Sequence, residues 1–172
     1  ALIGTLRHSP LLAVLRAENP ISLVPIVADL AAVGILHVEI AWSTATTWVE
    51  GCRQLRARFP ALQLGAASIV QPQALEAVAA AGLAYAVSPV LDRRLLQRAS
   101  ALDLVLVPGV MTPSEVLCAQ SHGFSLVKLF PAEQAGGLGM VKALAGPFAD
   151  MQLCPTGGVS ADNMQAYLRQ PN

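Results

Sequence analysis

The sequence has 172 residues, of which 54% are hydrophobic and 13% charged, and its 11 Lys and Arg residues balance its 11 Asp and Glu residues. This composition predicts a buried core in a single domain over residues 1–172 and excludes intrinsic disorder. A net charge of zero offers no electrostatic basis for binding nucleic acid or an anionic membrane, so we expect neither partner.

Seven short apolar runs predict β-strands, and each is followed by a segment with helical periodicity. The runs cover residues 11–16, 37–42, 63–68, 84–89, 104–109, 125–131 and 151–158. Their starts lie 20 to 26 residues apart, which is room for one strand, one loop and one helix. The spacing therefore predicts seven successive βα units.

Start and stop signals mark the helices between these runs. Asn19-Pro20 predicts the start of the first helix, and Gly34 predicts its end. The segment from Thr112 to Glu115 has the pattern of a capping box, with the glutamate three residues after the threonine. The segment from Ser160 to Asn163 is expected to open the last helix.

Strands that alternate with helices predict a parallel sheet with right-handed crossovers. Seven such units without a change in composition favour a (β/α)8 TIM barrel over an open sheet. A closed barrel needs an eighth unit, and no eighth unit can be identified in the sequence. Seven strands in an open barrel would leave two unpaired edges, so we expect the barrel domain to be C-terminally incomplete here.

The sequence offers no signal for a membrane segment or a metal site. No run reaches the roughly 18 apolar residues that span a bilayer, and no signal peptide is visible. The cysteines form no C-x-x-C pair, which fits a reduced cytoplasmic compartment: Cys52, Cys118 and Cys154. The histidines are scattered over different elements, so we expect no metal and no cofactor: His8, His37 and His122.

Lys128 is one of only two lysines and lies in the apolar run from Ser125 to Pro131. Strand alternation places it on one face with Leu126 and Phe130, in apolar surroundings on either side. Burial lowers the pKa of a lysine, which yields the neutral amine that forms a Schiff base with a carbonyl. The structural alternatives are a lysine paired with a buried carboxylate and one that reaches solvent at a strand end; we favour the catalytic interpretation.

Glu39 is a carboxylate in the middle of the run 37–42. In a barrel whose register turns Lys128 inward, Glu39 can face the same cavity and move protons to and from a Schiff-base intermediate. The structural alternative is an ion pair with Lys128 or Arg16, which requires the same proximity without the chemistry. Here too we favour the catalytic interpretation.

The segment from Cys154 to Ser160 places Gly157 and Gly158 just before the expected last helix. Backbone N–H groups at such a turn, aided by a helix dipole, can bind an anion. The loops after strands seven and eight are also frequent phosphate sites in barrels. A tight strand-to-helix turn would have the same sequence, so the motif alone leaves both interpretations open.

Six blocks of the sequence form a distinctive ordered set. They are Glu39 in Val-Glu-Ile, Gly65-Ala66-Ala67-Ser68, Ser88-Pro89, Pro108-Gly109, Val127 to Glu133 and Cys154 to Gly158. In this order they resemble the KDPG/KHG aldolases, the class I aldolases of 2-keto-3-deoxy-6-phosphogluconate (KDPG) and 4-hydroxy-2-oxoglutarate (KHG). The resemblance covers nearly the whole chain.

The resemblance implies a homotrimer of (β/α)8 barrels. It also implies that Lys128 forms the Schiff base and that Glu39 transfers protons. The resemblance further places Ser68, Pro89 and Phe130 at the substrate. It places Thr156, Gly157 and Gly158 at the phosphate end of the substrate.

Departures from the family pattern concern the substrate. Many members carry an arginine four residues after the glutamate, where it holds the pyruvate carboxylate, and this chain has Ser43 there. A serine cannot replace a bidentate guanidinium, so we expect Arg16, at the end of strand one, to supply the charge. The related phosphogalactonate aldolases also lack the strand-two arginine, which keeps that substrate open. The family's Gly-Gly-Ser on strand eight has no counterpart in these residues.

The sequence therefore predicts a lyase, a Schiff-base aldolase that cleaves a 2-keto-4-hydroxy acid to pyruvate and an aldehyde, either glyceraldehyde 3-phosphate or glyoxylate. One alternative is cleavage of 2-keto-3-deoxy-6-phosphogalactonate. Another is a phosphosugar isomerase or epimerase with Glu39 as its base, which would leave Lys128 without a covalent role. A third is a non-catalytic paralogue that binds a keto acid without turnover.

Overall fold

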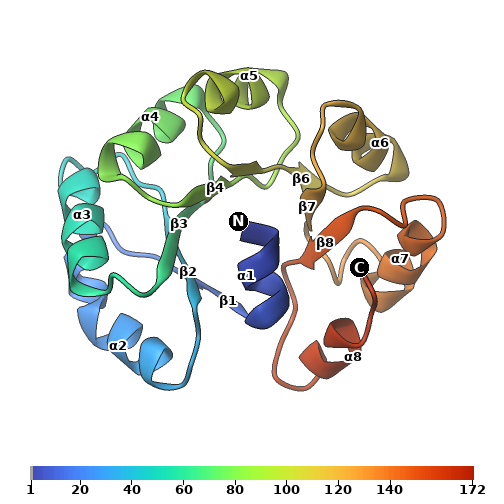
Figure 1. Cartoon of the computed structure of the whole chain (residues 1–172), viewed down its shortest axis with the longest axis horizontal. Coiled ribbons are helices and arrows are strands. Elements are labelled where there is room, and N and C mark those ends of the chain that lie inside the picture. The colour runs from blue at the N-terminus through green and yellow to red at the C-terminus, as the bar shows by residue number, and fades with distance from the viewer. Residues whose placement is uncertain (1) are drawn as a thin grey trace. The chain divides into compact units, whose positions relative to one another are not determined.

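The computed structural model describes residues 2–172, which form an α/β fold of strands alternating with helices (Figure 1). The chain divides into two compact units. The first unit runs to Ser88 and includes Arg93–Leu106, and the second unit consists of Pro89–Asp92 and Val107–Asn172. Each unit contains one sheet.

The first unit holds a five-stranded sheet in the order β1-β2-β3-β4-β5. Its strands are β1 (Leu12–Leu15), β2 (His37–Ala41), β3 (Gln63–Ala67), β4 (Tyr85–Val87) and β5 (Leu106–Val107). Its helices are α1 (Leu2–His8), the 3-10 helix η1 (Pro20–Leu23), α2 (Val24–Ala32), α3 (Trp48–Arg58), α4 (Pro72–Ala81) and α5 (Arg93–Ala101). A hydrogen bond of 2.9 Å between His37 Nε2 and Thr5 Oγ1 holds α1 at the amino end of β2. Proteins of the α/β class bind ligands at the carboxyl ends of the strands. In this sheet those ends lie away from α1.

The second unit holds a three-stranded parallel sheet in the order β6-β7-β8. Its strands are β6 (Gly109–Val110), β7 (Leu126–Leu129) and β8 (Gln152–Pro155). Its helices are α6 (Pro113–Ser121), α7 (Gly137–Ala145) and α8 (Met164–Leu168).

All seven apolar runs contain strands, as the spacing predicts. The fifth run is interrupted at Pro108, which separates β5 from β6, because proline lacks the N–H that a continuous strand would donate. If β5 and β6 are taken as one interrupted strand, residues 2–172 contain seven strand–helix pairs. Helix α1, which precedes the first run, is an element that the sequence reasoning did not predict.

The helix signals are confirmed at all three places. The Asn19 side chain caps η1, which continues directly into α2, and Gly34 follows with a φ of 85°. Thr112 and Glu115 form the expected capping box at the start of α6. The segment from Ser160 to Asn163 leads directly into the last helix, α8, which begins at Met164 and has five residues. The Asn163 side chain accepts from Ser160 N (2.7 Å), and the backbone before α8 forms a turn.

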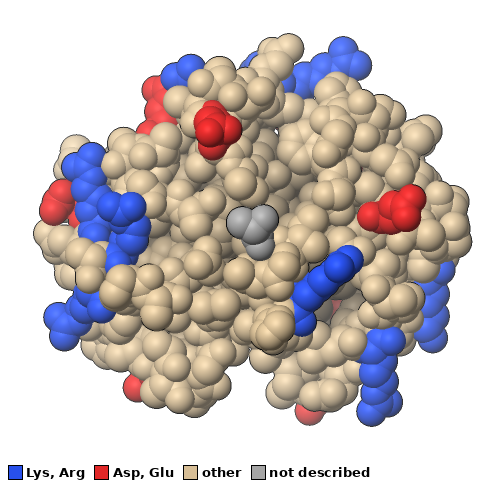
Figure 2. Space-filling view, viewed as in Figure 1, with Lys and Arg blue, Asp and Glu red and all other residues tan. Residues whose placement is uncertain are grey.

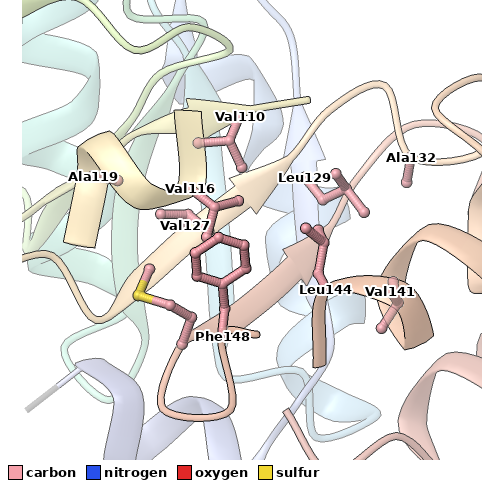
Figure 3. Packing of buried hydrophobic residues seen from close by; sticks show 10 residues of the cluster. Val110, Val116, Ala119, Val127, Leu129, Ala132, Val141, Leu144 and Phe148 are labelled. Atoms are coloured by element: carbon pink, nitrogen blue, oxygen red, sulfur yellow. The ribbon is translucent and has the colours of Figure 1, made fainter. Parts of the chain in front are cut away.

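A hydrophobic cluster in the second unit determines which way β7 faces (Figure 3). Val127 and Leu129, both fully buried, point into this cluster together with side chains of α6 and α7. Because side chains alternate along a strand, Lys128 lies on the other face of the sheet, the face that α6 and α7 do not cover.

Charges are sparse on the protein. On the face shown in Figure 2 most of the surface is uncharged, and the charged side chains lie in small separate groups. None of the helices among the described residues is both long and apolar enough to cross a bilayer.

Candidate active site

Lys128 lies in the middle of the three-stranded sheet of the second unit. Its strand register pairs it with Gly109 on β6 and with Cys154 on β8. The residue is only 6% exposed, although its neighbours Val127 and Leu129 point to the opposite face. A long side chain that ends in an amine thus lies in the interior, on the face that does not form the core.

The ring of Phe130 lies beside the Lys128 amine, with its centroid 4.9 Å from Nζ. The face of an aromatic ring attracts a positive charge, so this contact suits a cationic nitrogen. The same ring packs against the turn after β8: a Cβ at Gly157 would lie 3.4 Å from Phe130 Cε2. Phe130 therefore contacts both Lys128 and this turn.

Pro89 packs against the strand next to Lys128. A Cβ added to Gly109 would lie 2.5 Å from Pro89 O and 2.6 Å from Val90 N, so the two backbone segments leave no room for a side chain. Gly109 N donates to Val90 O (3.2 Å), which holds the two segments together. The Ser-Pro and Pro-Gly blocks of the sequence thus meet beside Lys128.

The turn after β8, defined here as Thr156, Gly157 and Gly158, is held by its three carbonyl oxygens. The bonds are Ala132 N to Thr156 O (2.8 Å), Glu133 N to Gly157 O (3.2 Å) and Asn163 Nδ2 to Gly158 O (3.0 Å). In a trans peptide the carbonyl and the following N–H point in opposite directions. The N–H groups of Gly157, Gly158 and Val159 therefore point away from these donors.

The conformation of this turn requires glycine, since Gly157 and Gly158 have φ values of 93° and 81°. The Thr156 hydroxyl donates to Cys154 O on the preceding strand, β8 (3.2 Å). The expected contribution of a helix dipole is absent, because five-residue α8 starts only at Met164. Any anion at this turn would be bound by its peptide N–H groups.

Glu39 lies in the first unit, on β2, between β1 and β3 of the five-stranded sheet. It is 1% exposed and pairs in register with Val14 on β1 and with Gly65 on β3. Gly65 in turn pairs with Tyr85 on β4, whose ring covers the glycine: a Cβ there would lie 2.5 Å from Tyr85 Cζ. Glu39, Gly65 and Tyr85 thus form a row across the sheet in which glycine makes room for the tyrosine ring.

Arg16 and Ser43 line the same open pocket, of about 280 Å³, at the carboxyl ends of β1 and β2. Trp42 and Glu18 also line this pocket. Ser43 Oγ accepts a hydrogen bond from Ala45 N (3.1 Å), which leaves the Ser43 O–H as a donor. The pocket thus offers a guanidinium and a hydroxyl donor to a ligand.

Ser68 follows β3 directly and has a φ of 63°, a left-handed conformation that is uncommon for residues other than glycine. It is half-buried. Such conformations concentrate at ligand sites, where the surrounding structure maintains them.

The predicted site residues therefore fall into two groups. The second unit brings together Lys128, Phe130, Pro89, Thr156, Gly157 and Gly158. The first unit holds Glu39, Arg16, Ser43 and Ser68, of which Arg16 and Ser43 share a pocket.

The cysteines and histidines give no metal site. Among residues 2–172, no three His, Cys, Asp or Glu side chains are placed to hold a metal ion. Burial raises the pKa of the Cys52 thiol to about 12, so this cysteine is a neutral, apolar part of the core.

Sequence reasoning missed several residues around the site. Tyr85 could have been found from Gly65, because a glycine within a strand often marks the close approach of another group. Trp42 directly precedes Ser43, but its place in the pocket depends on the path of the loop. The hydrogen bond between Tyr167 and Glu133 joins residues 34 positions apart and leaves no local signal.

Comparison with known proteins identifies the family. The model of the KDPG and KHG aldolase family matches residues 2–172. The chain belongs to this family. Its relatives include the 2-dehydro-3-deoxy-phosphogluconate aldolase of Pseudomonas aeruginosa, 38% identical over 173 residues, which cover 100% of this chain and 78% of that protein. The KHG/KDPG aldolase of Escherichia coli is 35% identical over 159 residues, 92% of this chain and 73% of that protein.

Solved KDPG aldolases have the same fold. The enzyme from Legionella pneumophila, captured with pyruvate as a covalent carbinolamine, has a TM-score of 0.88 and 34% identity, covering 95% of this chain and 79% of that one. The enzyme of Zymomonas mobilis with 3-phosphoglycerate has a TM-score of 0.90 and 29% identity, covering 99% and 80%. These similarities confirm the predicted fold class, the α/β fold of the TIM-barrel type.

Proposed function

We propose that the protein is a class I aldolase that reversibly cleaves a 2-keto-4-hydroxy acid to pyruvate and an aldehyde. The substrates that we consider first are KDPG, which yields glyceraldehyde 3-phosphate, and KHG, which yields glyoxylate. The proposal rests on the surroundings of Lys128. This lysine is buried on the face of β7 opposite the hydrophobic cluster, and the ring of Phe130 lies beside its amine. Membership in an aldolase family supports the same chemistry.

Lys128 is the nucleophile in this proposal. Its neutral amine attacks the C2 carbonyl of the substrate, and loss of water from the resulting carbinolamine leaves a cationic iminium. When the bond between C3 and C4 breaks, its electron pair moves into the iminium and gives an enamine. The Phe130 ring favours the positive charge that the iminium carries before this step.

Glu39 moves the protons. It removes the proton of the C4 hydroxyl as the C3–C4 bond breaks, so that C4 leaves as an aldehyde. It then returns a proton to C3 of the enamine, and water releases pyruvate from Lys128. Glu39 is 1% exposed, so bulk water does not compete for the proton that it carries between C4 and C3.

The substrate carboxylate binds in the pocket of Arg16 and Ser43. The guanidinium supplies the positive charge, and the serine hydroxyl supplies one further hydrogen bond. Ser68 and Pro89 are proposed to contact the keto-acid part of the substrate. The resulting arrangement replaces the strand-two arginine of many family members with an arginine from the end of β1.

The turn of Thr156, Gly157 and Gly158 binds the distal end of the substrate. Its N–H groups point away from the loops that hold its carbonyls, which is the arrangement that an anion such as a phosphate requires. This orientation favours a phosphorylated substrate. KHG, which has a carboxylate in place of the phosphorylated segment, lacks the group that this turn is proposed to bind.

A second substrate, 2-keto-3-deoxy-6-phosphogalactonate, is favoured by one observation. Arg16 and Ser43 line a single pocket, which is compatible with recognition of the carboxylate without a strand-two arginine. The two phosphorylated substrates differ in the configuration at C4. Comparison of kcat/KM for both epimers decides which one the site prefers.

A pyruvate-release assay tests the proposal. The wild-type protein should release pyruvate from KDPG, and Lys128→Met should abolish this activity while keeping a side chain of similar length and volume. The matched control is Lys142→Met, at the exposed lysine of α7, which should retain activity. Binding of substrate without pyruvate release would support a non-catalytic protein, and interconversion of phosphosugars without release would support an isomerase.

Two properties of the assembled protein follow from the family. We propose a homotrimer, which sedimentation equilibrium should report as three times the chain mass. We also propose a cytoplasmic location, in line with free thiols on Cys52, Cys118 and Cys154. Fractionation of the producing cells checks the second point.

A further inference from the structure

Glu133 lies next to the turn of Thr156, Gly157 and Gly158, and its side chain is held by neighbouring groups although it is exposed. Its carboxylate accepts a hydrogen bond from the hydroxyl of Tyr167 on α8. Two glycines make room for it: a Cβ at Gly137 would lie 3.3 Å from Glu133 Oε1, and a Cβ at Gly158 would lie 2.7 Å from Glu133 Cβ. Larger residues at either position would displace the Glu133 side chain.

The direction of the hydrogen bond between Tyr167 and Glu133 is defined. The pKa of Tyr167 is raised to about 12 by burial, by the hydrogen bond to Glu133 and by the charge of that carboxylate. At neutral pH the tyrosine is therefore protonated and donates, and the carboxylate accepts. A hydrogen bond to a charged acceptor is stronger than one between neutral groups.

The same residue also holds the turn through its backbone. Glu133 N donates to Gly157 O, and Ala132 N donates to Thr156 O. A change in the position of Glu133 therefore changes the direction of the peptide planes in the turn. Because each N–H points opposite to the preceding carbonyl, it also changes where the N–H groups of Gly157 and Gly158 point.

We propose that Tyr167 and Glu133 form a clasp that positions the turn of Thr156, Gly157 and Gly158 for the phosphate end of the substrate. The inference rests on the proposed function of this turn. Both residues are positioning residues, since they act through the turn and not on the reacting atoms. A change in the clasp should therefore alter substrate binding, measured by KM, and leave the chemistry at Lys128, measured by kcat, little changed.

The first test is Tyr167→Phe, which removes only the hydroxyl. For KDPG we expect KM to rise about tenfold, the effect of losing a charge-assisted hydrogen bond, with kcat little changed. For KHG, which carries no phosphate, KM should stay near its wild-type value. The matched control is Gln165→Ala, an exposed position on the same helix, which should change neither constant.

Rescue by a conservative variant separates positioning from loss of fold. Glu133→Gln retains an oxygen that can accept from Tyr167, whereas Glu133→Ala removes it. We expect the glutamine variant to have a KM for KDPG between those of the wild type and the alanine variant. Thermal unfolding of each variant shows that the comparison is made on folded protein.

A measurement that needs no turnover uses amide hydrogen exchange with inorganic phosphate as the probe. In the wild type, phosphate should slow exchange of the amides of residues 157–159. In Tyr167→Phe, exchange of these amides should be faster without phosphate, and the protection by phosphate should be weaker.

The outcomes distinguish the clasp from the aldolase proposal. If the wild type releases pyruvate but Tyr167→Phe leaves both the KM for KDPG and the exchange of residues 157–159 unchanged, the clasp is refuted and the aldolase proposal stands. If the wild type releases no pyruvate, the aldolase proposal fails. The clasp is then supported or refuted by the phosphate-dependent exchange alone.

Discussion

Arg16 is expected to hold the substrate carboxylate, and Arg16→Ala tests this role. The side chain lines a pocket with Ser43, whose hydroxyl is the other polar donor that we assign to the carboxylate. A hydrogen bond to a charged group contributes about 1.5–3 kcal/mol, and about 1.4 kcal/mol corresponds to a factor of ten. Removal of the guanidinium should therefore weaken pyruvate binding about 10-fold to 150-fold.

The reciprocal change places the charge just after the neighbouring strand, β2. Ser43→Arg, introduced into Arg16→Ala, puts a guanidinium at another point on the wall of the same pocket. We expect this double variant to recover a large part of the lost affinity, because the carboxylate regains a bidentate partner. In the presence of Arg16, the Ser43→Arg change should tighten pyruvate binding further.

The assay is the dependence of borohydride inactivation on pyruvate concentration, which yields the apparent affinity for pyruvate. Arg58→Ala, at the exposed end of α3, is the matched control for loss of one arginine. An Arg16→Ala protein that is folded and binds pyruvate as tightly as the wild type would show that another group holds the carboxylate. A double variant without any recovery would show that the pocket is not the carboxylate site.

Three further changes have defined expectations. Glu39→Gln should keep the fold and lower kcat about 10²- to 10⁴-fold, since it removes proton transfer; a loss smaller than about tenfold in steady-state rates would remove Glu39 from the mechanism. Gly109→Ala should destabilise the protein by about 1–3 kcal/mol in urea unfolding, because its Cβ would meet the Pro89 backbone. Burial lowers the pKa of His37, and a hydrogen bond with the Ser9 backbone opposes this effect without cancelling it. The unfolded chain therefore binds the proton more readily, so the free energy of unfolding should fall as the pH drops below about 6.5, and His37→Gln should reduce this slope.

The order and type of the elements were predictable because they depend on local patterns. The spacing of apolar runs located every strand, and Thr112 with Glu115 located the start of α6. Alternation along β7 also predicted that Lys128 shares a face with Leu126 and Phe130, and the burial of Val127 and Leu129 in the core shows that this face lies opposite the core. Each of these inferences needs no knowledge of distant contacts.

The features that were not predictable depend on residues far apart in the chain. The ring of Tyr85 over Gly65 and the bond from Tyr167 to Glu133 arise only when separate elements pack together. A glycine within a strand, such as Gly65, indicates that some group approaches closely, but the sequence patterns used here do not identify which distant residue it is.

The most direct test of the account is the trapping of a Schiff base on Lys128. Incubation of the protein with pyruvate and borohydride should reduce the iminium to a stable secondary amine, which adds mass to the peptide that contains Lys128 and inactivates the protein irreversibly. Lys142, the other lysine, should stay unmodified, and Lys128→Met should give no adduct. An adduct on Lys142 alone, or no adduct with the folded wild-type protein, would contradict the assignment of this chain as a class I aldolase.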